Sequence, residues 1–224
     1  MPARHDRDIA AALLDRHGRT YAAEAGIRLA DKPAPLYQLL VLATLLSARI
    51  SGDIAVSAAR ELRQAGYRTP RAMREASWQD RVDALGRGHY RRYDERTATM
   101  LGDGAELLLN RWSGDLRTLH GEAGDDTGKL AALLTEFPGI GPAGAAIFLR
   151  EVQAVWTGIA PYLDKKALDG ARQLGLPADP GVLAALAGDN GRVARLAAAL
   201  IRVSLSRTAA DDIKAGPGAT RKGS

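Results

Sequence analysis

The segment Phe137-Pro138-Gly139-Ile140-Gly141-Pro142 says most about how this chain folds. Leucines precede it at helical spacing, and alanines, Ile147 and Leu149 follow it at the same spacing. Two helices are therefore expected, joined by a tight turn whose glycines permit positive φ and close approach of another backbone. Pro142 suits the first position of the second helix. Ile140 is expected to point inward and lock the two helices together.

The start of the helix after Gly141 is expected to bind an anion. Backbone N–H groups in a first helical turn have no partner inside the helix, and the positive end of the helix dipole lies beside them. A DNA phosphate is such an anion, and contacts of this kind hold a strand without reading its bases. An ordinary turn between two helices explains the spacing more simply. The residues around the turn must therefore decide between an ordinary turn and a DNA-binding hairpin.

The rest of the chain also has the pattern of helices. Alanine and leucine dominate, aromatic residues make up 5%, and no segment alternates in the way of a half-buried strand. Prolines at 33 and 35 are expected to break the chain before a central apolar helix over residues 36–48, and residues 113–128 are expected to form a loop. The sequence therefore predicts an all-α protein.

Composition excludes several classes of site. The chain of 224 residues has no cysteine, which excludes disulfides, thiol catalysis and cysteine-held iron–sulfur clusters. Four histidines are few for a histidine-built metal site. The net charge of +5 permits a nucleic-acid partner without requiring one. No apolar run approaches the ~20 residues of a membrane span, and the N-terminus does not resemble a secretory signal, so a cytoplasmic protein is expected.

Beyond the hairpin, three further segments strengthen one resemblance. Residues 137–145, between two apolar helices, resemble the helix-hairpin-helix motif of the base-excision DNA glycosylases, the endonuclease III-like group. Residues 45–49 (Leu-Leu-Ser-Ala-Arg) resemble that family's segment ending in glutamine near the DNA. Residues 86–98 resemble its Gly-Leu-Tyr loop and the helix that follows. Residues 159–164 end in Leu-Asp where the family has Val-Asp before a helix. The resemblance covers about residues 36–205.

This resemblance implies a two-lobed all-α fold with a central cleft between the lobes. Residues 35–153 are expected to form a helical barrel domain that ends in the helix-hairpin-helix, at about 130–153. Residues 1–34 and 154–212 are expected to form the second helical domain, with residues 213–224 as a disordered tail. The cleft would hold Asp164.

The resemblance also assigns a catalytic carboxylate to Asp164. Hydrolysis of an N-glycosidic bond passes through a sugar that is positive at its anomeric carbon, and a nearby carboxylate either stabilises that charge or deprotonates the attacking water. A simple helix cap is the alternative role for this residue, and the two roles are compatible. Three neighbours are expected to line the pocket or contact phosphates: Tyr162, Lys165 and Lys166.

The DNA-binding residues are expected in three places. The hairpin would contribute backbone groups of residues 139–141, 143 and 144. Arg49 stands where the family has the glutamine that enters the gap left by a flipped base. The segment His89-Tyr90-Arg91-Arg92-Tyr93 interleaves cations with flat rings, which suits phosphates and a stacked or inserted base. The predicted hairpin contacts are thus Gly139, Ile140, Gly141, Ala143 and Gly144.

The sequence departs from the family in ways that affect its chemistry. Ala143 stands where the strand-cleaving members have a lysine, and alanine forms no Schiff base. The iron–sulfur loop is missing, so no cofactor is expected from side chains, although family hairpins often hold a monovalent cation through backbone carbonyls. The expected partner is double-stranded DNA with a damaged or mismatched base, bound by a monomer associated with the nucleoid.

Three functions are therefore in competition. The first is a monofunctional DNA glycosylase that uses Asp164 and water. The second is a DNA- or lesion-binding protein that keeps the fold without catalysis. The third is a bifunctional glycosylase and lyase that uses Lys165 or Lys166 in place of the missing hairpin lysine. The excised base is not identified by the sequence, because its pocket walls come from several helices.

Overall fold

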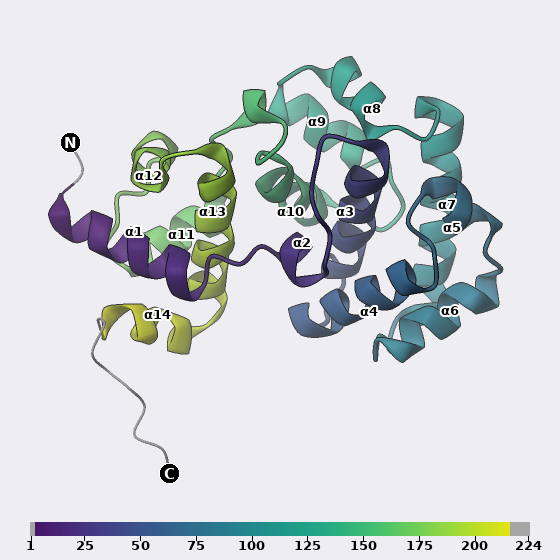
Figure 1. Cartoon of the computed structure of the whole chain (residues 1–224), viewed down its shortest axis with the longest axis horizontal. Helices are drawn as coiled ribbons and strands as arrows, with labels where there is room; N and C mark the ends of the chain where they lie inside the picture. Colours follow the sequence, from purple (N-terminus) through teal and green to yellow (C-terminus); the bar gives the residue numbers. More distant parts are fainter. Residues whose placement is uncertain (1–2, 216–224) are drawn as a thin grey trace, which may run out of the picture. The chain divides into compact units, whose positions relative to one another are not determined.

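The computed structural model describes residues 3–215, and within that range the chain is helical with no strand (Figure 1). The chain divides into two compact units. Unit 1 combines the residues up to Thr20 with those from Gln153 onward, and unit 2 comprises Tyr21–Val152. The all-α prediction is confirmed for the described residues. Each unit has its own core and is described here by itself.

Unit 2 is built around one almost fully buried helix. Nine of the fourteen residues of α3, from Leu36 to Leu45, are buried, which explains why its sequence is apolar on every side. Helices α4, α7, α8 and α10 all pack on α3. The helices of the unit are α2 (Tyr21–Glu24), α3 (Pro33–Leu46), α4 (Gly52–Gln64), α5 (Pro70–Glu75), α6 (Trp78–Arg87), α7 (Asp94–Trp112), α8 (Leu116–Ala123), α9 (Thr127–Leu134) and α10 (Pro142–Val152).

Two local predictions in unit 2 are wrong. Pro33 and Pro35 do not break the chain; they lie in the first turn of α3, where a missing N–H leaves no hydrogen bond unmade. The expected loop over residues 113–128 contains α8, which Asp115 caps through a hydrogen bond from the Arg117 backbone. Leu116 and Leu119 of this helix are fully buried, so tertiary packing outweighs the surrounding glycines and acidic residues.

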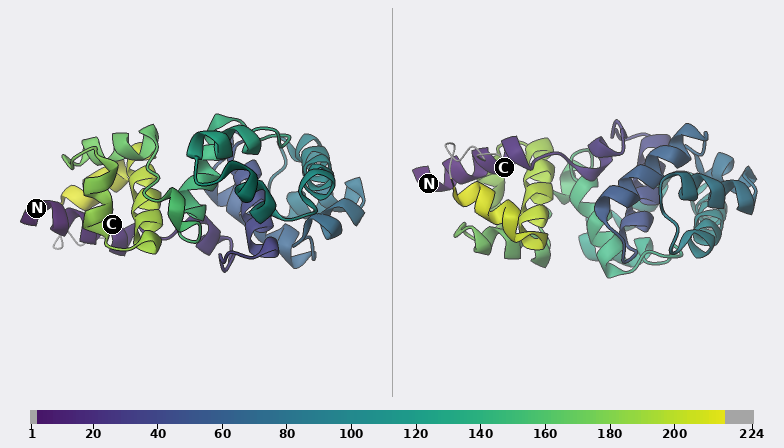
Figure 2. Two further views of the ribbon diagram at one scale, coloured as in Figure 1. Left: turned by 90° about the horizontal axis from the view of Figure 1, so that it is seen from above. Right: turned by 90° about the horizontal axis from the view of Figure 1, so that it is seen from below.

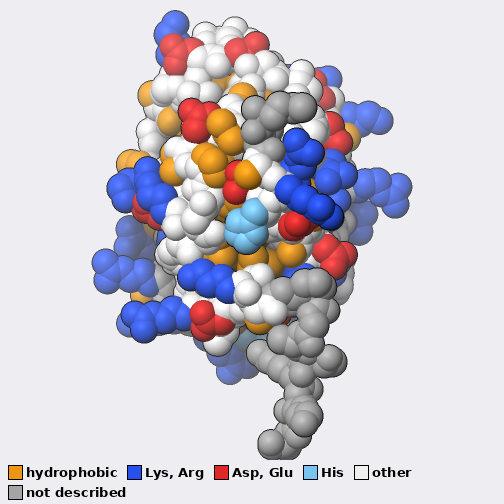
Figure 3. Space-filling view, turned by 90° about the vertical axis from the view of Figure 1, so that its left-hand side faces the viewer, with side chains coloured by type: hydrophobic (Ala, Val, Ile, Leu, Met, Phe, Trp, Pro, Cys, Tyr) orange, Lys and Arg blue, Asp and Glu red, His pale blue; other side chains and the backbone are white. Residues whose placement is uncertain are grey.

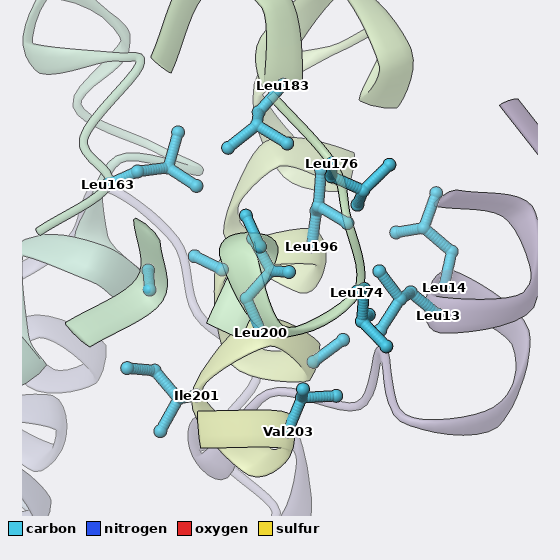
Figure 4. Packing of buried hydrophobic residues seen from close by; sticks show 14 of the residues in the cluster. Leu13, Leu14, Leu163, Leu174, Leu176, Leu183, Leu196, Leu200, Ile201 and Val203 are labelled. Carbon is cyan, nitrogen blue, oxygen red and sulfur yellow. The ribbon is translucent and has the colours of Figure 1, made fainter. Parts of the chain in front are cut away.

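Unit 1 joins the two ends of the described chain. Helix α1 packs against α12, α13 and α14, and Figure 2 shows the purple α1 beside the yellow α14. Apolar residues of these helices, of α11 and of the segments flanking α11 form one cluster that includes Leu196 and Leu200 of α13, seen from close by in Figure 4. The helices of the unit are α1 (Arg4–Arg16), α11 (Lys165–Gln173), α12 (Pro180–Ala187), α13 (Asn190–Leu205) and α14 (Arg207–Lys214), with a short 3-10 helix η1 (Thr157–Ile159) before α11.

The units differ in their bounds from the expected domains. Residues 21–34 lie in unit 2 rather than with the N-terminal helix, because α2 packs against α3 and α4. The C-terminal part of the chain forms two helices, since Ser206 ends α13 and caps α14 through a hydrogen bond from Ala209. Ile213, placed in the predicted disordered tail, is buried at the end of α14. Residues 216–224 of that tail lie outside the described residues.

Gly170 sets how closely two helices of unit 1 approach. A Cβ at this position of α11 would lie 2.1 Å from the backbone oxygen of Leu200 in α13, a distance that no real Cβ adopts. Glycine therefore lets the backbones of α11 and α13 pack in direct contact. The spacing of these helices bears on the site, because α11 begins directly after Asp164.

Replacing this glycine is expected to destabilise unit 1. Gly170→Ala should lower the free energy of unfolding by about 1–3 kcal/mol, because the added methyl group forces the two backbones apart. Gly86→Ala in α6 is the matched control: no atom lies within 4 Å of its Cβ position, so this change should stabilise the protein by about 0.5–1 kcal/mol through helix propensity. Urea unfolding of the two variants would contradict the account if both shifted the same way.

None of the helices among residues 3–215 has the length and the apolar character needed to cross a membrane.

Candidate functional site

The hairpin joins α9 to α10 through the turn predicted from the sequence. Ile140 is 4% exposed and Phe137 2% exposed, so the apolar residues of the turn fill the space between the helices. Gly139 has φ +85°, a conformation that favours glycine, whereas Gly141 has an ordinary φ. The two glycines therefore serve different purposes. Gly139 allows the chain to turn, whereas Gly141 leaves the backbone at the start of α10 uncovered by a side chain.

Backbone N–H groups are available at the start of α10. The first hydrogen bond of this helix runs from the Ala145 N–H to the Gly141 carbonyl. Within residues 3–215, no group accepts a hydrogen bond from the N–H of Gly141 or of Ala143, and both residues are exposed. Such groups, beside the positive end of the helix dipole, suit an anion. The side chain of Ala143 offers no amine at this place.

The hairpin packs tightly on the end of α3. A Cβ on Gly144 would lie 2.3 Å from the Ser47 hydroxyl oxygen, so only glycine allows α10 to approach α3 this closely. A Cβ on Gly139 would lie 2.7 Å from the Met100 sulfur of α7. Because both glycines lack a Cβ, the turn and the start of α10 pack closely against the end of α3 and against Met100 of α7.

A pocket of about 270 Å³ opens where these three segments meet. Its wall is formed by the end of α3, by the loop and first turns of α7, and by the hairpin turn. All of these segments belong to unit 2, so its geometry depends on that unit alone. The lining residues are Thr44, Ser47, Ala48, Arg49, Tyr90, Tyr93, Arg96, Thr97, Met100 and Gly139.

Arginines lie around this pocket without acidic partners. Arg49 and Arg96 line it and are exposed, and neither forms an ion pair with any described residue. The Arg92 guanidinium stacks over the ring of Tyr93, 5.4 Å from its centroid. Unpaired cations beside aromatic rings are the combination that holds a nucleic-acid backbone and stacks a base.

Burial excludes one of the two roles predicted for Tyr90. Its side chain is fully buried, and its hydroxyl receives a weak hydrogen bond, at 3.4 Å, from Thr97. Burial raises the pKa of Tyr90 above the ordinary tyrosine value. Tyr90 therefore forms part of the pocket wall and is unavailable as a side chain inserted between bases. The residues of this segment that remain available for insertion between bases include the half-buried Tyr93 and the exposed His89 and Arg91.

The unusual backbone of His89 has a structural explanation. His89 has φ +63°, and α6 ends here in a Schellman arrangement: the Tyr90 N–H bonds the Leu85 carbonyl, and the His89 N–H bonds the Gly86 carbonyl. The preceding Gly88 is required because a Cβ there would lie 2.4 Å from the Ala58 backbone of α4. The loop is thus fixed by its neighbours, with the His89 side chain outward.

One buried polar group behind the pocket has no partner. The Tyr37 hydroxyl is the only buried side-chain polar atom that lacks a hydrogen bond among the described residues. Burial raises the pKa of Tyr37 well above its ordinary value, so the phenol stays neutral. A buried hydroxyl without a hydrogen bond costs about 1–3 kcal/mol of folding free energy, so this group does not stabilise the fold. No pattern in the sequence signalled it.

Asp164 lies at the start of α11 in unit 1. It is the N-cap, and its carboxylate Oδ1 accepts a hydrogen bond of 3.1 Å from the Ala167 N–H. Leu163 on one side is buried in the apolar cluster of unit 1, and Ala167 on the other is fully buried. The half-buried carboxylate is therefore held by a rigid backbone.

The backbone just before Asp164 is clamped by a buried amide. The Gln153 side chain accepts a hydrogen bond of 2.8 Å from the Tyr162 N–H and donates one of 2.9 Å to the Tyr162 carbonyl. Gln153 itself is fully buried. The two lysines after Asp164 differ: Lys165 pairs with Asp169 at 2.8 Å, whereas exposed Lys166 forms no ion pair with any described residue.

The predicted site residues divide between the two units. Arg49, Tyr90, Tyr93 and Gly139 share the pocket of unit 2. Asp164, Tyr162, Lys165 and Lys166 belong to unit 1. The lining residues that were not predicted from the sequence are Thr44, Ser47, Ala48, Arg96, Thr97 and Met100. The missed residues of α7 follow Tyr93 at helical spacing. A helix face that packs into the core has the same spacing, so the pattern does not indicate a pocket.

The face of the molecule drawn in Figure 3 carries side chains of both charges. In the space-filling view of Figure 3, basic and acidic side chains lie interspersed with small hydrophobic areas. Within residues 3–215, no group of three or more acidic, histidine or cysteine side chains is placed to hold a metal ion. The chemistry available to the described residues is that of carboxylates, arginines, hydroxyls and backbone N–H groups.

Comparison with protein-family models finds no match to the chain, and comparison with curated proteins finds no similar sequence. The function is therefore inferred from the residues and their geometry.

Proposed function

We propose that this protein is a DNA glycosylase of base excision repair, which extrudes a damaged or mismatched base and hydrolyses its N-glycosidic bond. One observation carries the proposal. Three segments whose sequences resemble DNA-contacting parts of the helix-hairpin-helix glycosylases converge in unit 2 on a single pocket, beside a helix start with unpaired N–H groups. An ordinary turn between helices would not require this convergence.

The hairpin and the arginines would hold the DNA backbone. The N–H groups of Gly141 and Ala143 suit one phosphate, and the exposed Arg49 and Arg91 suit neighbouring ones. Extruding a nucleotide costs a few kcal/mol, which a side chain filling the vacated space offsets. Arg49 and Tyr93 are the residues proposed for that place, because both lie at the pocket and neither is fully buried.

Asp164 would supply the charge for hydrolysis. As the base departs with the electrons of the glycosidic bond, positive charge develops on the sugar, and a fixed carboxylate stabilises it. Water then adds to the anomeric carbon, and the proton that it loses ends on the departed base, so the products are a neutral free base and an abasic sugar. The rigid backbone around Asp164 means that little reorganisation is needed during this step. No cofactor is required for these steps.

Strand cleavage is not part of the proposal. Ala143 carries no amine, and Lys165 is engaged with Asp169. Lys166 is the remaining candidate for a Schiff base, since it forms no ion pair within the described residues.

The proposal is tested with duplexes that each carry one lesion or mismatch. The full chain should release a base from at least one of them, and strand breaks should appear only after alkali treatment. Breaks without alkali, together with a borohydride-trapped adduct that Lys166→Ala or Lys165→Ala abolishes, would replace this function by that of a bifunctional lyase. Tight binding to lesions with no release from any duplex would favour a binding protein.

A further inference from the structure

The pocket of unit 2 has the chemistry of a site for a flat heterocycle. Its volume of about 270 Å³ is near the lower end of the range for small-molecule sites. Tyr90 and Met100 give it apolar surface, and the hydroxyls of Thr44 and Thr97 offer hydrogen bonds. Arg49 and Arg96 add unpaired positive charge. An uncharged ring attached to a phosphate backbone matches this distribution of groups.

A second cavity lies behind the first. It has about 10 Å³ of free space, room for about one water-sized group. Thr44 and Met100 line both cavities, so these two side chains separate them. Tyr37, whose buried hydroxyl has no partner among the described residues, lines the second cavity.

Of the two side chains shared by the cavities, that of Met100 can change its position. Met100 is only half-buried, and an unbranched methionine side chain changes rotamer easily. Because Gly139 has no Cβ, the Met100 sulfur packs directly against the hairpin turn, so a rotamer change of Met100 is what opens the partition. A single exocyclic atom of a ligand could therefore pass Met100 and reach the Tyr37 hydroxyl, which can donate to an oxo group or accept from an amino group.

We propose that the two cavities form one nucleobase site, with the ring in the larger cavity and an exocyclic oxo or amino group in the smaller one, hydrogen-bonded to Tyr37. The inference rests on the proposed function for its partner, DNA. The base comes either from the damaged strand, as the extruded nucleotide, or from the opposite strand, as its former partner. The same ring chemistry applies to both.

The test uses 2-aminopurine, a fluorescent base with an exocyclic amino group, whose emission rises when it leaves the base stack. It is placed in one duplex at the target position and in another in the opposite strand, facing an abasic site. Binding of the full chain should raise the emission in one of the two duplexes, which identifies the source of the base. No rise in either duplex overturns the proposal.

Two variants test the two cavities separately. Met100→Trp should fill the larger cavity and abolish the rise, whereas Glu106→Trp, an exposed position of the same helix, should preserve it. Should Met100→Trp fail to fold, Ala48→Leu at the rim serves in its place. Tyr37→Phe should weaken binding of the responsive duplex about fivefold, the loss of about one neutral hydrogen bond, with Tyr67→Phe as the unaffected control.

The measurements distinguish a failure of the nucleobase-site proposal from a failure of the proposed glycosylase function. Affinity for a duplex in which two abasic sites face each other, so that no base is left to enter the pocket, should be unchanged in Met100→Trp when it is measured in parallel. A rise that survives both Met100→Trp and Ala48→Leu would show that the base lies elsewhere, while base release by the wild type would leave the glycosylase function standing. Tyr37→Phe without effect would exclude the inner hydrogen bond.

Discussion

Asp164→Asn is expected to lower the rate of base release by about 10²–10³-fold, the usual loss when a group that stabilises transition-state charge is removed. Asparagine caps helices as well as aspartate does, so the hydrogen bond to the Ala167 N–H and the fold of α11 should persist. The change therefore removes the negative charge while it keeps the helix cap. Single-turnover release from the preferred duplex measures it.

The control for this variant is Asp179→Asn. Asp179 caps α12 of the same unit in the same way, by accepting a hydrogen bond of 2.9 Å from the Val182 N–H. The Asp179→Asn variant should release base at the wild-type rate. Affinity for lesion-containing DNA should stay within about twofold for both variants, because neither residue is assigned a phosphate contact. Equal rates for Asp164→Asn and the wild type would remove Asp164 from the chemistry.

Arg81→Met is expected to give the largest loss of stability, about 3 kcal/mol or more. The Arg81 side chain is buried and donates to three backbone carbonyls, those of Met73, Ala76 and Ala98, at 3.0, 2.8 and 2.8 Å. It thereby joins α5, α6 and α7. Methionine fills a similar volume but donates nothing, so these carbonyls lose their partner in a place with little access to water.

Arg71→Met provides the comparison on a neighbouring helix. Arg71 is exposed on α5, and its loss should change the free energy of unfolding by less than about 0.5 kcal/mol. Urea unfolding followed by circular dichroism compares the two variants. A similar midpoint for both would mean that the carbonyls bonded by Arg81 find other donors.

Several helix starts were predictable because their signals are local. Ser51 and Thr69 cap α4 and α5, as their side chains and the following proline or acidic residue indicate. Asp164 likewise caps α11. Each cap depends on a side chain and a backbone N–H within three residues. Helix α8 escaped prediction because its stability comes from Leu116 and Leu119 packing into a core that is distant in sequence.

The candidate site was predictable only in part, for the same reason. Arg49, Tyr93 and Gly139 could be selected from three short segments by resemblance, but their convergence on one pocket is a tertiary fact. The burial of Tyr90 and the unpartnered hydroxyl of Tyr37 depend on which face of a helix meets its neighbours. The bounds of the units could not be read either, since residues 21–34 carry no sequence signal that joins them to unit 2.

The most direct measurement of the central claim is the identity of the products from a lesion-containing duplex after a single turnover. Mass spectrometry of the reaction with the full chain should show a free base and an otherwise intact strand that carries one abasic sugar. With Asp164→Asn, the free base should be nearly absent over the same time, although the duplex is still bound. An unaltered strand with the wild-type protein for every lesion and mismatch tried would contradict the assignment of this protein as a glycosylase.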